Sequence, residues 1–355
     1  MSRLLTPQPQ RPATSEFEQV LVERGRRSDA TIAIAVHSTV LGPALGGARM
    51  WHYESDQDAV ADARRLAGAM TLKAAAAGLE LGGGKGVINA PVAAPEGDLR
   101  RALLLDFGDA IESLGGRYIT AEDVGTCMAD MAVIAERTAH VSGRDPSQGG
   151  TGDPSPVTAH GVVAAMRACA AAAFESRSLA GLRVCIIGLG HVGRYIAEEL
   201  AAEGAELIVT DIRPERAEDA QALGARWVEP DLAISTPCEI LAPCALGGLI
   251  DWDSISKLAA GVVCGAANNI LSEDGLAVEL AERGILYAPD FLANAGGIIS
   301  IYGELHGYNQ ARGLELSEGI ETSMADAIAE AQALGTTPLE AAKRLAALRL
   351  DAAAR

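Results

Sequence analysis

The sequence predicts an α/β protein of two domains, and the observations behind this prediction are length, alternation and a cluster of turn formers. The chain has 355 residues, more than one hydrophobic core usually supports. Strand-like and helix-like segments alternate along most of it, as layered α/β folds require. Residues 149–156, Gly-Gly-Thr-Gly-Asp-Pro-Ser-Pro, are typical of a linker. We therefore expect a first domain at 1–148, joined by C-terminal helices within 320–355, and a second domain at 149–319.

Composition and charge narrow the classes of function. The formal net charge of −18 disfavours nucleic-acid partners, because their phosphates would be repelled. No apolar run reaches the roughly 18 residues of a membrane helix, and residues 1–11 lack the apolar core of a signal peptide. The six cysteines form no C-x-x-C pair and no His/Cys cluster at metal-ligand spacing. We expect a cytoplasmic protein with reduced thiols, no metal site and no membrane partner.

The first half of the chain reads as strands alternating with helices. Two strands joined by a polar turn form an antiparallel pair, at 17–23 and 31–37. The segment 41–47 is too rich in glycine for a helix or a regular strand and is expected to be irregular. A helix follows at 55–79, where Ser55 and Asp58 form a capping-type start. Beyond a glycine turn at 82–84, we expect a strand at 87–90, a helix at 99–114 and a strand at 117–120.

Two of the few lysines lie around the glycine turn. Lysine occurs only at Lys73, Lys85, Lys257 and Lys343. Burial and neighbouring charges can tune a lysine into a base, whereas an arginine stays protonated. Glycines at 82–84 would let a substrate approach the backbone, so Lys85 is the first candidate for chemistry. The alternative interpretation of this stretch is a glycine turn that carries a solvated lysine.

A carboxylate follows the strand predicted at 117–120. Asp123 precedes Gly125 at the carboxyl end of that strand, where α/β folds often carry functional residues. The helix predicted at 126–135 offers an alternative, in which Asp123 is only a helix cap. Both interpretations remain open from the residues alone.

The clearest motif lies in the second half. An apolar strand at 183–187 leads into Gly188-Leu-Gly-His-Val-Gly193, then a helix through residue 200 and a strand that ends at Asp211. This is the G-x-G-x-x-G fingerprint of a Rossmann-type βαβ unit in its required context. A pyrophosphate can lie on the helix N-terminus, and Asp211 can accept ribose hydroxyls. The motif predicts a bound dinucleotide, with NAD favoured over NADP, although Arg213 leaves NADP open.

Further strands are predicted at 239–242, 261–264 and 284–287, separated by helical stretches, as a doubly wound parallel sheet requires. Asparagines follow two of these strands, where strand ends open onto a cofactor crevice. Asn268, Asn269 and Asn294 could orient a nicotinamide or a substrate carboxylate there, or simply form turns. An alanine-rich helical segment, broken at 335–338, closes the chain and is expected to pack on the first domain or on another subunit.

Several motifs together resemble one known family. They are Leu41-Gly-Pro-Ala-Leu-Gly-Gly-Ala-Arg-Met-Trp-His-Tyr53, Gly-Gly-Gly-Lys at 82–85, Tyr118-Ile-Thr-Ala-Glu-Asp-Val-Gly-Thr126 with Ala129-Asp-Met131, Asp153-Pro-Ser-Pro-Val-Thr158, Ala242-Pro-Cys-Ala-Leu-Gly247 and Phe291-Leu-Ala-Asn-Ala-Gly-Gly297. In this order they resemble the Glu/Leu/Phe/Val amino-acid dehydrogenases, over nearly the whole chain from residue 17. The residues of these motifs are most similar to those of the leucine branch, with the phenylalanine branch next.

The resemblance implies a reaction and roles for particular residues. The reaction is the reversible oxidative deamination of an L-amino acid by NAD⁺ and water to a 2-oxo acid and ammonia, in a homo-oligomer. Lys73 would bind the substrate carboxylate, Lys85 would activate water as a base, and Asp123 would exchange a proton with the substrate nitrogen. Other substrate contacts would be Leu45, Gly46, Gly47, Met70, Ala121, Asn268, Ile298 and Ile301. The cofactor contacts would be Thr158, Gly188, Gly190, His191, Val192, Gly193, Asp211, Ile212, Ala245, Asn268 and Asn294.

The pocket positions that the resemblance implies also indicate a substrate class. Their walls are aliphatic and hold no partner for a γ-carboxylate, which disfavours glutamate because a buried unpaired charge is costly. Ile298 and Ile301 narrow the pocket and favour leucine, isoleucine or valine over phenylalanine, which is the runner-up. An alternative of another class is a non-catalytic NAD-binding sensor or scaffold. Such a protein would need neither Lys85 nor Asp123.

Overall fold

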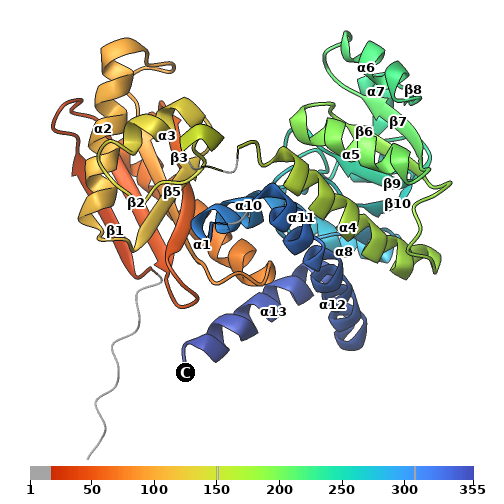
Figure 1. The fold of residues 1–355 in the computed structure, drawn as a ribbon. Coiled ribbons are helices and arrows are strands. Elements are labelled where there is room, and N and C mark those ends of the chain that lie inside the picture. The colour runs from red at the N-terminus through yellow and green to blue at the C-terminus, as the bar shows by residue number, and fades with distance from the viewer. Residues whose placement is uncertain (1–16, 149, 151, 308) are drawn as a thin grey trace, which may run out of the picture.

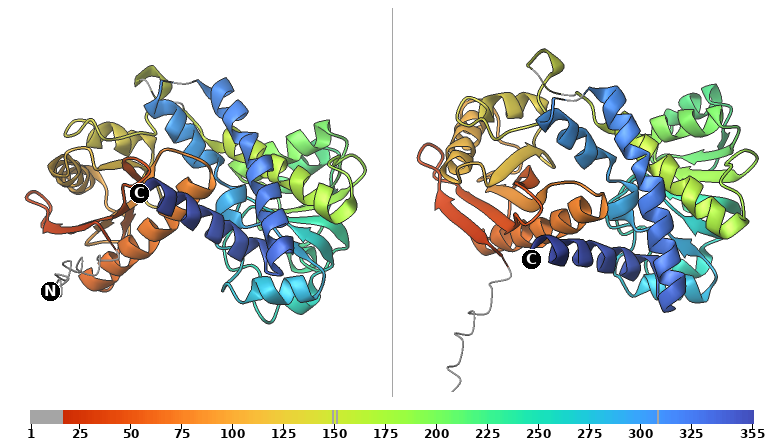
Figure 2. Two further views of the ribbon diagram at one scale, coloured as in Figure 1. Left: turned by 90° about the horizontal axis from the view of Figure 1, so that it is seen from below. Right: turned by 60° about the horizontal axis from the view of Figure 1, so that its bottom comes forward.

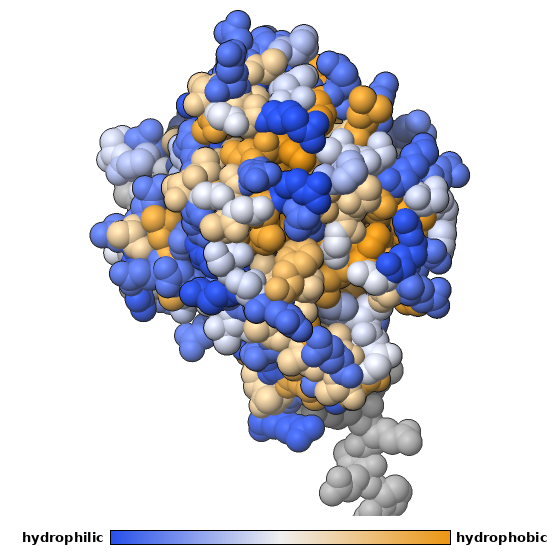
Figure 3. Space-filling view, turned by 90° about the vertical axis from the view of Figure 1, so that its right-hand side faces the viewer, coloured by the Kyte–Doolittle hydropathy of each residue, from blue (hydrophilic) through white to orange (hydrophobic). Residues whose placement is uncertain are grey.

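Two β-sheets organise the chain in the computed structural model, which describes residues 17–148, 150, 152–307 and 309–355 (Figure 1). Residues 1–11, for which the sequence predicts no signal-peptide core, lie outside the described residues. The first sheet has the strand order β1-β2-β4-β3-β5 and the second has the order β11-β10-β9-β6-β7-β8. The predicted boundary at residue 149 falls between them and stays a prediction. Hydrophilic side chains cover much of the face that the second sheet and its helices present in Figure 3, with hydrophobic residues in scattered patches.

The first sheet combines an antiparallel edge with three parallel strands. β1 pairs with β2 and β2 with β4 in antiparallel fashion, whereas β4, β3 and β5 run parallel. The elements of this half are β1 (Gln19–Arg24), β2 (Thr31–Ser38), β3 (Ala44–Trp51), α1 (Asp56–Ala76), β4 (Gly82–Asn89), α2 (Gly97–Ser113), β5 (Tyr118–Glu122) and α3 (Met128–Ile134). The predicted antiparallel pair at the start of the chain is therefore confirmed.

Helix α1 covers one face of this sheet because its small residues repeat at helical spacing. Ala59, Ala63 and Ala67 are fully buried against Val87 and neighbouring alanines of the sheet. The Oγ atom of Ser55 accepts a hydrogen bond from the Asp58 N–H at 3.2 Å, so the predicted cap is present. This close packing carries the last turn of α1, with Lys73, along the sheet.

Two glycine-rich segments differ from the prediction, because residues 44–47 and 82–84 are strand, whereas residues 41–43 are irregular as expected. The segment 41–47, expected to be irregular, runs into β3 at Ala44, and the predicted glycine turn at 82–84 is the start of β4. A Cβ on Gly84 would lie 2.7 Å from the Tyr118 ring, and one on Gly83 would lie 2.1 Å from the backbone nitrogen of Thr71. The glycines thus let helix, ring and strand pack closely around β4, which is what glycine often marks inside a strand.

The second sheet is parallel throughout and has the doubly wound order that the sequence predicts. Its order reverses between β6 and β9, where a cofactor crevice is expected in such folds. The elements of this half are α4 (Ser155–Phe174), β6 (Arg183–Ile187), α5 (His191–Ala202), β7 (Glu206–Thr210), α6 (Arg216–Ala222), β8 (Arg226–Trp227), α7 (Pro230–Ala233), β9 (Cys238–Pro243), β10 (Ala260–Val263), α8 (Leu276–Glu282), β11 (Leu286–Tyr287), α9 (Asp290–Ala293), α10 (Gly296–Leu305), α11 (Gln310–Ser317), α12 (Gly319–Leu334) and α13 (Pro338–Ala353).

Helix α4 is long and apolar enough to span a bilayer by length and composition, but its apolar residues form a core. In its most apolar 18-residue window, 67% is buried, and the helix packs against α5, α10, α11 and α12. All six cysteines are free.

The C-terminal helices connect the two halves. α12 packs on α4 of the second half, whereas α13 reaches α1 of the first half, as Figures 1 and 2 show. The guanidinium of Arg349 in α13 donates hydrogen bonds to the carbonyl oxygens of Ala75 at 3.0 Å and Gly78 at 2.9 Å. Because the last carbonyls of a helix have no partner within the helix, Arg349 serves as a cap for the end of α1.

The packing around β4 leads to a prediction about stability. A Cβ on Gly86 would lie 2.3 Å from the Phe107 ring, so Gly86→Ala should lower the free energy of unfolding by about 1–3 kcal/mol through overpacking. Urea unfolding followed by circular dichroism measures the change. The control is Gly319→Ala, where an added Cβ meets no heavy atom within 4 Å. Equal midpoints for the two variants would contradict this account of the strand.

Candidate functional site

The register of the first sheet places several candidate residues on the face covered by α1. Successive side chains of a strand alternate between faces, and paired residues of neighbouring strands share a face. Arg49 of β3 pairs with Val87 of β4, and Gly47 of β3 pairs with Ala121 of β5. Lys85, two residues before Val87, therefore lies on the same face as Gly47.

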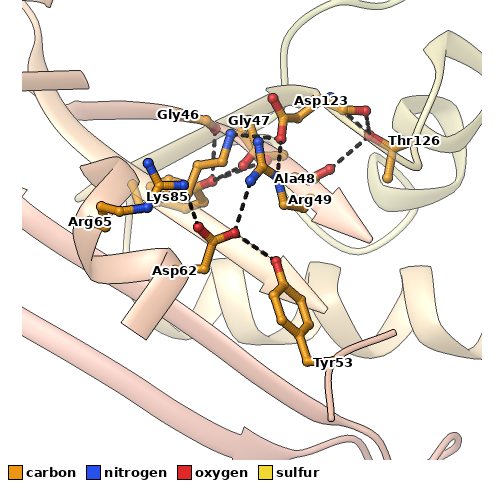
Figure 4. Close-up of polar contacts among 12 residues, drawn as sticks. Gly46, Gly47, Ala48, Arg49, Tyr53, Asp62, Arg65, Lys85, Asp123 and Thr126 are labelled. Atoms are coloured by element: carbon orange, nitrogen blue, oxygen red, sulfur yellow. Dashed lines mark hydrogen bonds and ion pairs between the residues drawn. The ribbon is translucent and has the colours of Figure 1, made fainter. Parts of the chain in front are cut away.

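Lys85 and Asp123 form an ion pair on this face. The Nζ atom of Lys85 lies 2.9 Å from Oδ2 of Asp123, and the Lys85 side chain is only 5% exposed (Figure 4). Burial lowers the pKa of Lys85, although the Asp123 carboxylate opposes this. Burial would raise the pKa of Asp123, but the charges of Lys85 and Arg49 hold it below its usual range. The pair therefore favours the ionised form of Asp123, while burial favours the neutral form of Lys85.

The absence of a Cβ atom at Gly47 makes this ion pair possible. A Cβ there would lie 2.6 Å from Cβ of Asp123 and 3.2 Å from Nζ of Lys85. Asp123 does not cap the following helix, because Cys127 is the N-cap of α3 and Asp123 precedes it by four residues. Its backbone N–H instead donates to Oγ1 of Thr126 at 3.0 Å, which fixes the chain just after β5.

Three polar residues of this site were missed by sequence reasoning. Nε of Arg49 donates to Oδ2 of Asp123 at 2.9 Å, and its Nη1 donates to Oδ2 of Asp62 at 2.8 Å. The hydroxyl of Tyr53 donates to the same Asp62 oxygen at 2.7 Å. Arg49 could have been found as a charged residue two positions after Gly47, on the same face of a buried strand. This inference requires β3 to be recognised as a strand.

Lys73 contacts the second half of the chain. Its Nζ atom donates to Oδ1 of Asn294 at 2.7 Å and to Oδ1 of Asn268 at 3.2 Å. Burial lowers the pKa of Lys73 to about 8. The amide nitrogen of Asn294 in turn donates to Oδ1 of Asn268 and to the backbone carbonyl of Ala266. These two asparagines therefore lie beside the lysine.

Most predicted pocket residues belong to one hydrophobic cluster. Leu45 and Ile298 are buried in it, and Met70 and Ile301 pack against it. The remaining positions belong to the first sheet: Ala121 is buried on the face of Gly47, whereas Gly46 lies within the sheet, where its carbonyl accepts the Tyr118 hydroxyl at 2.7 Å. Four of the aliphatic positions thus belong to one extended hydrophobic cluster, and Gly46 acts through its backbone carbonyl.

The glycine-rich loop has the geometry of a phosphate-binding turn. Gly188 has φ +105°, and a Cβ on it would lie 2.8 Å from Cβ of Ala245. A Cβ on Gly193 would collide with the carbonyl oxygen of Gly188, so α5 packs tightly on β6. Gly190 faces open space, and α5 begins directly after it with His191 and Val192, whose helix end can receive an anion.

Asp211 lies at the carboxyl end of β7, beside this loop. Its Oδ2 accepts the Leu189 N–H at 2.8 Å, and its Oδ1 accepts the backbone N–H and Nε of Arg213. Burial opposes ionisation, but these donors hold the pKa of Asp211 below its usual range. Ile212, next along the chain, is 85% exposed. Thr158, in the first turn of α4, donates its hydroxyl to the Pro154 carbonyl at 3.0 Å.

Two family models and several curated proteins match this chain. Residues 16–140 match the family model described as "Glu/Leu/Phe/Val dehydrogenase, dimerisation domain", and residues 209–354 match "Glutamate/Leucine/Phenylalanine/Valine dehydrogenase". A leucine dehydrogenase of Bacillus subtilis (strain 168) is 46% identical over 95% of this chain and 92% of its own length. A valine dehydrogenase of Streptomyces virginiae is 44% identical over 94% of each chain.

A solved structure agrees with these relatives. The L-tryptophan dehydrogenase of Nostoc punctiforme superposes with a TM-score of 0.86 at 36% identity, over 96% of this chain and 97% of its own. Sequence and fold agree along almost the full length, and the chain belongs to the Glu/Leu/Phe/Val dehydrogenase family.

Proposed function

We propose that this protein is an NAD-dependent L-amino-acid dehydrogenase that prefers leucine, valine or isoleucine. The reaction converts the amino acid, NAD⁺ and water into the 2-oxo acid, ammonia and NADH, and it is reversible. The observation that carries the proposal is the buried Lys85–Asp123 ion pair, with Lys73 facing Asn268 and Asn294. The leucine and valine dehydrogenases at 44–46% identity support the same reaction.

Lys73, Asp123 and Lys85 have different roles in the reaction, which follow from their charges and positions. Lys73 binds the substrate carboxylate, whose negative charge favours the protonated form of a lysine with a pKa of about 8. Asp123 exchanges a proton with the substrate nitrogen, and Lys85, when neutral, takes the proton of the water that attacks the α-carbon. Burial lowers the pKa of Lys85 and so increases the neutral fraction near neutral pH. Lys73 thus acts on the substrate carboxylate, whereas Lys85 acts on the water that attacks the α-carbon.

The residues around the glycine-rich loop fit a dinucleotide. NAD⁺ supplies the hydride acceptor when it is bound. Gly188, Gly190 and Gly193 leave room for its pyrophosphate at the start of α5, and Asp211 would accept ribose hydroxyls. The charge of Asp211 disfavours the 2′-phosphate of NADP, and the Arg213 side chain is already paired with Asp211. Ile212, Ala245, Thr158 and the two asparagines remain proposed contacts for its remaining groups.

The aliphatic pocket favours a branched-chain substrate. Leu45, Met70, Ile298 and Ile301 share one hydrophobic cluster, so a γ-carboxylate would find no charged partner among them. Phenylalanine is the second candidate substrate. A non-catalytic NAD sensor is disfavoured, because such a protein has no use for a buried lysine beside a carboxylate.

Assembly and location are also proposals. The family model that matches residues 16–140 is described as a dimerisation domain, which supports a homo-oligomer. Six free cysteines support a reducing compartment such as the cytoplasm. The partners we propose are the amino acid, its 2-oxo acid and ammonia.

A substrate panel tests the proposed function directly. NADH formation at alkaline pH should be largest with leucine, valine or isoleucine, smaller with phenylalanine or tryptophan, and least with glutamate. The measurement is absorbance at the NADH band, repeated with NADP⁺ in place of NAD⁺. No turnover of any amino acid would refute the dehydrogenase.

Replacement of the proposed base tests its role. Lys85→Ala should abolish turnover while NADH still binds, because the lysine acts on water and lies on the first sheet rather than at the glycine-rich loop. NADH fluorescence measures binding, and the exposed Lys257 provides the control variant Lys257→Ala. Full activity of Lys85→Ala would remove Lys85 from the mechanism.

Enlargement of the pocket tests the proposed specificity. Ile298→Ala together with Ile301→Ala should shift the ratio of kcat/KM for phenylalanine over leucine upward by about tenfold or more, since each methylene is worth about 1–3 kcal/mol. Ile285→Ala removes the same groups from a different core and should leave the ratio unchanged. An unaltered ratio in the double variant would show that these residues do not line the pocket.

A further inference from the structure

The carboxylate of Asp123 is held by one oxygen only. Its Oδ2 accepts Nζ of Lys85 and Nε of Arg49, each at 2.9 Å. Its Oδ1 has no hydrogen bond to any residue that the structure describes, and it points away from both cations in Figure 4. One oxygen is thus fixed by two cations, while the other is left for a substrate.

Arg49 is fixed in turn by groups from outside its own strand. Its Nη1 donates to Oδ2 of Asp62 in α1 at 2.8 Å, and that oxygen also accepts the Tyr53 hydroxyl at 2.7 Å. Oδ1 of Asp62 accepts Nη2 of Arg65 at 2.6 Å from the solvent side, where Arg65 is 61% exposed. Arg49 and Asp62 are largely buried, with 21% and 16% of their side chains exposed. A chain of polar contacts therefore runs from Tyr53 through Asp62 and Arg49 to Asp123.

We propose that Arg49, anchored by Asp62 and Tyr53, is a positioning residue for the reaction. It holds Asp123 by Oδ2 so that Oδ1 faces the substrate nitrogen, and it adds a positive charge beside Lys85. This inference rests on the proposed function, and it adds residues that act through Asp123 and Lys85 rather than on the substrate itself.

The shape of the guanidinium supports this role. Nε and Nη1 lie on different parts of one rigid plane, so Arg49 bridges two carboxylates that belong to different elements. A lysine has a single nitrogen on a flexible chain and cannot hold both in this geometry. The bridge therefore couples the position of α1, which carries Lys73 and Asp62, to the orientation of Asp123.

Charge gives the same residues a second effect. The charged groups that face Lys85 are Asp123 after β5, Arg49 in β3, and Asp62 and Lys73 in α1. Besides burial, the Asp123 and Asp62 carboxylates raise the pKa of Lys85, whereas Arg49 lowers it. Loss of Arg49 and loss of the Asp62 charge should therefore move the titration of Lys85 in opposite directions. A general loss of structure would not shift the pKa of Lys85 in opposite directions in the two variants.

The test compares pH profiles of kcat for oxidative deamination of the best substrate. Arg49→Gln should move the ascending limb to higher pH, and Asp62→Asn should move it to lower pH. Arg49→Lys keeps the charge and should leave the limb in place, but kcat should fall by about tenfold or more because the bridge is lost. Contributions common to all variants, such as the substrate's own ammonium group, cancel in this comparison.

The control is Arg65→Gln, which removes an exposed partner of the same Asp62 carboxylate. It should change neither the limb nor kcat by more than about twofold, because exposed ion pairs contribute little. Melting temperature and NADH binding show whether each variant folds. If Arg49→Gln does not fold, Asp62→Asn and Arg49→Lys carry the test.

Two results would overturn the inference while leaving the reaction in place. One is an unchanged limb in folded Arg49→Gln, and the other is a shift of Asp62→Asn in the same direction as Arg49→Gln. An unaltered protein that turns over no amino acid refutes the proposed function instead. The two failures are therefore separate.

Discussion

The ion pair between Lys85 and Asp123 depends on residue 47 being a glycine, which has no side chain. It forms across Gly47, where even a methyl group would lie 2.6 Å from Cβ of Asp123. The three parallel strands must hold a fixed register for these residues to form one row, and small residues must let α1 lie close to the sheet. A buried lysine and carboxylate tolerate little displacement, since each charge alone in that position would be costly.

The second half of the fold could be predicted from local patterns. The strand at 183–187 matches β6 residue for residue, and the glycine fingerprint, the helix after it and the parallel order are confirmed. Apolar runs bounded by glycine carry this information within a few residues of sequence. β8, α7 and α9 were not predicted, and each has only two to four residues. β11 is as short as β8 but lies within the strand predicted at 284–287.

The first half was harder because its glycines act through tertiary contacts. The glycines at 82–84 suggest a turn when taken alone, yet β4 is a central strand packed against α1, Tyr118 and Phe107. Recognition of this strand requires the partners that the glycines approach. The same error hid Arg49, since the face of a side chain cannot be assigned before its strand is known. The contacts of Lys73 with Asn268 and Asn294 span 195 and 221 residues, so no local pattern predicts them. The family resemblance implied only that all three residues lie around the substrate and cofactor.

The Arg349 contacts place a requirement on biosynthesis. The end of α1, which carries Lys73, obtains its cap from a residue near the other end of the chain, 271 positions beyond Gly78. During translation, the ribosome releases α1 long before α13, so α1 lacks this cap until residue 349 has emerged. A nascent chain that has already formed both sheets therefore still lacks the hydrogen bonds that hold the end of α1.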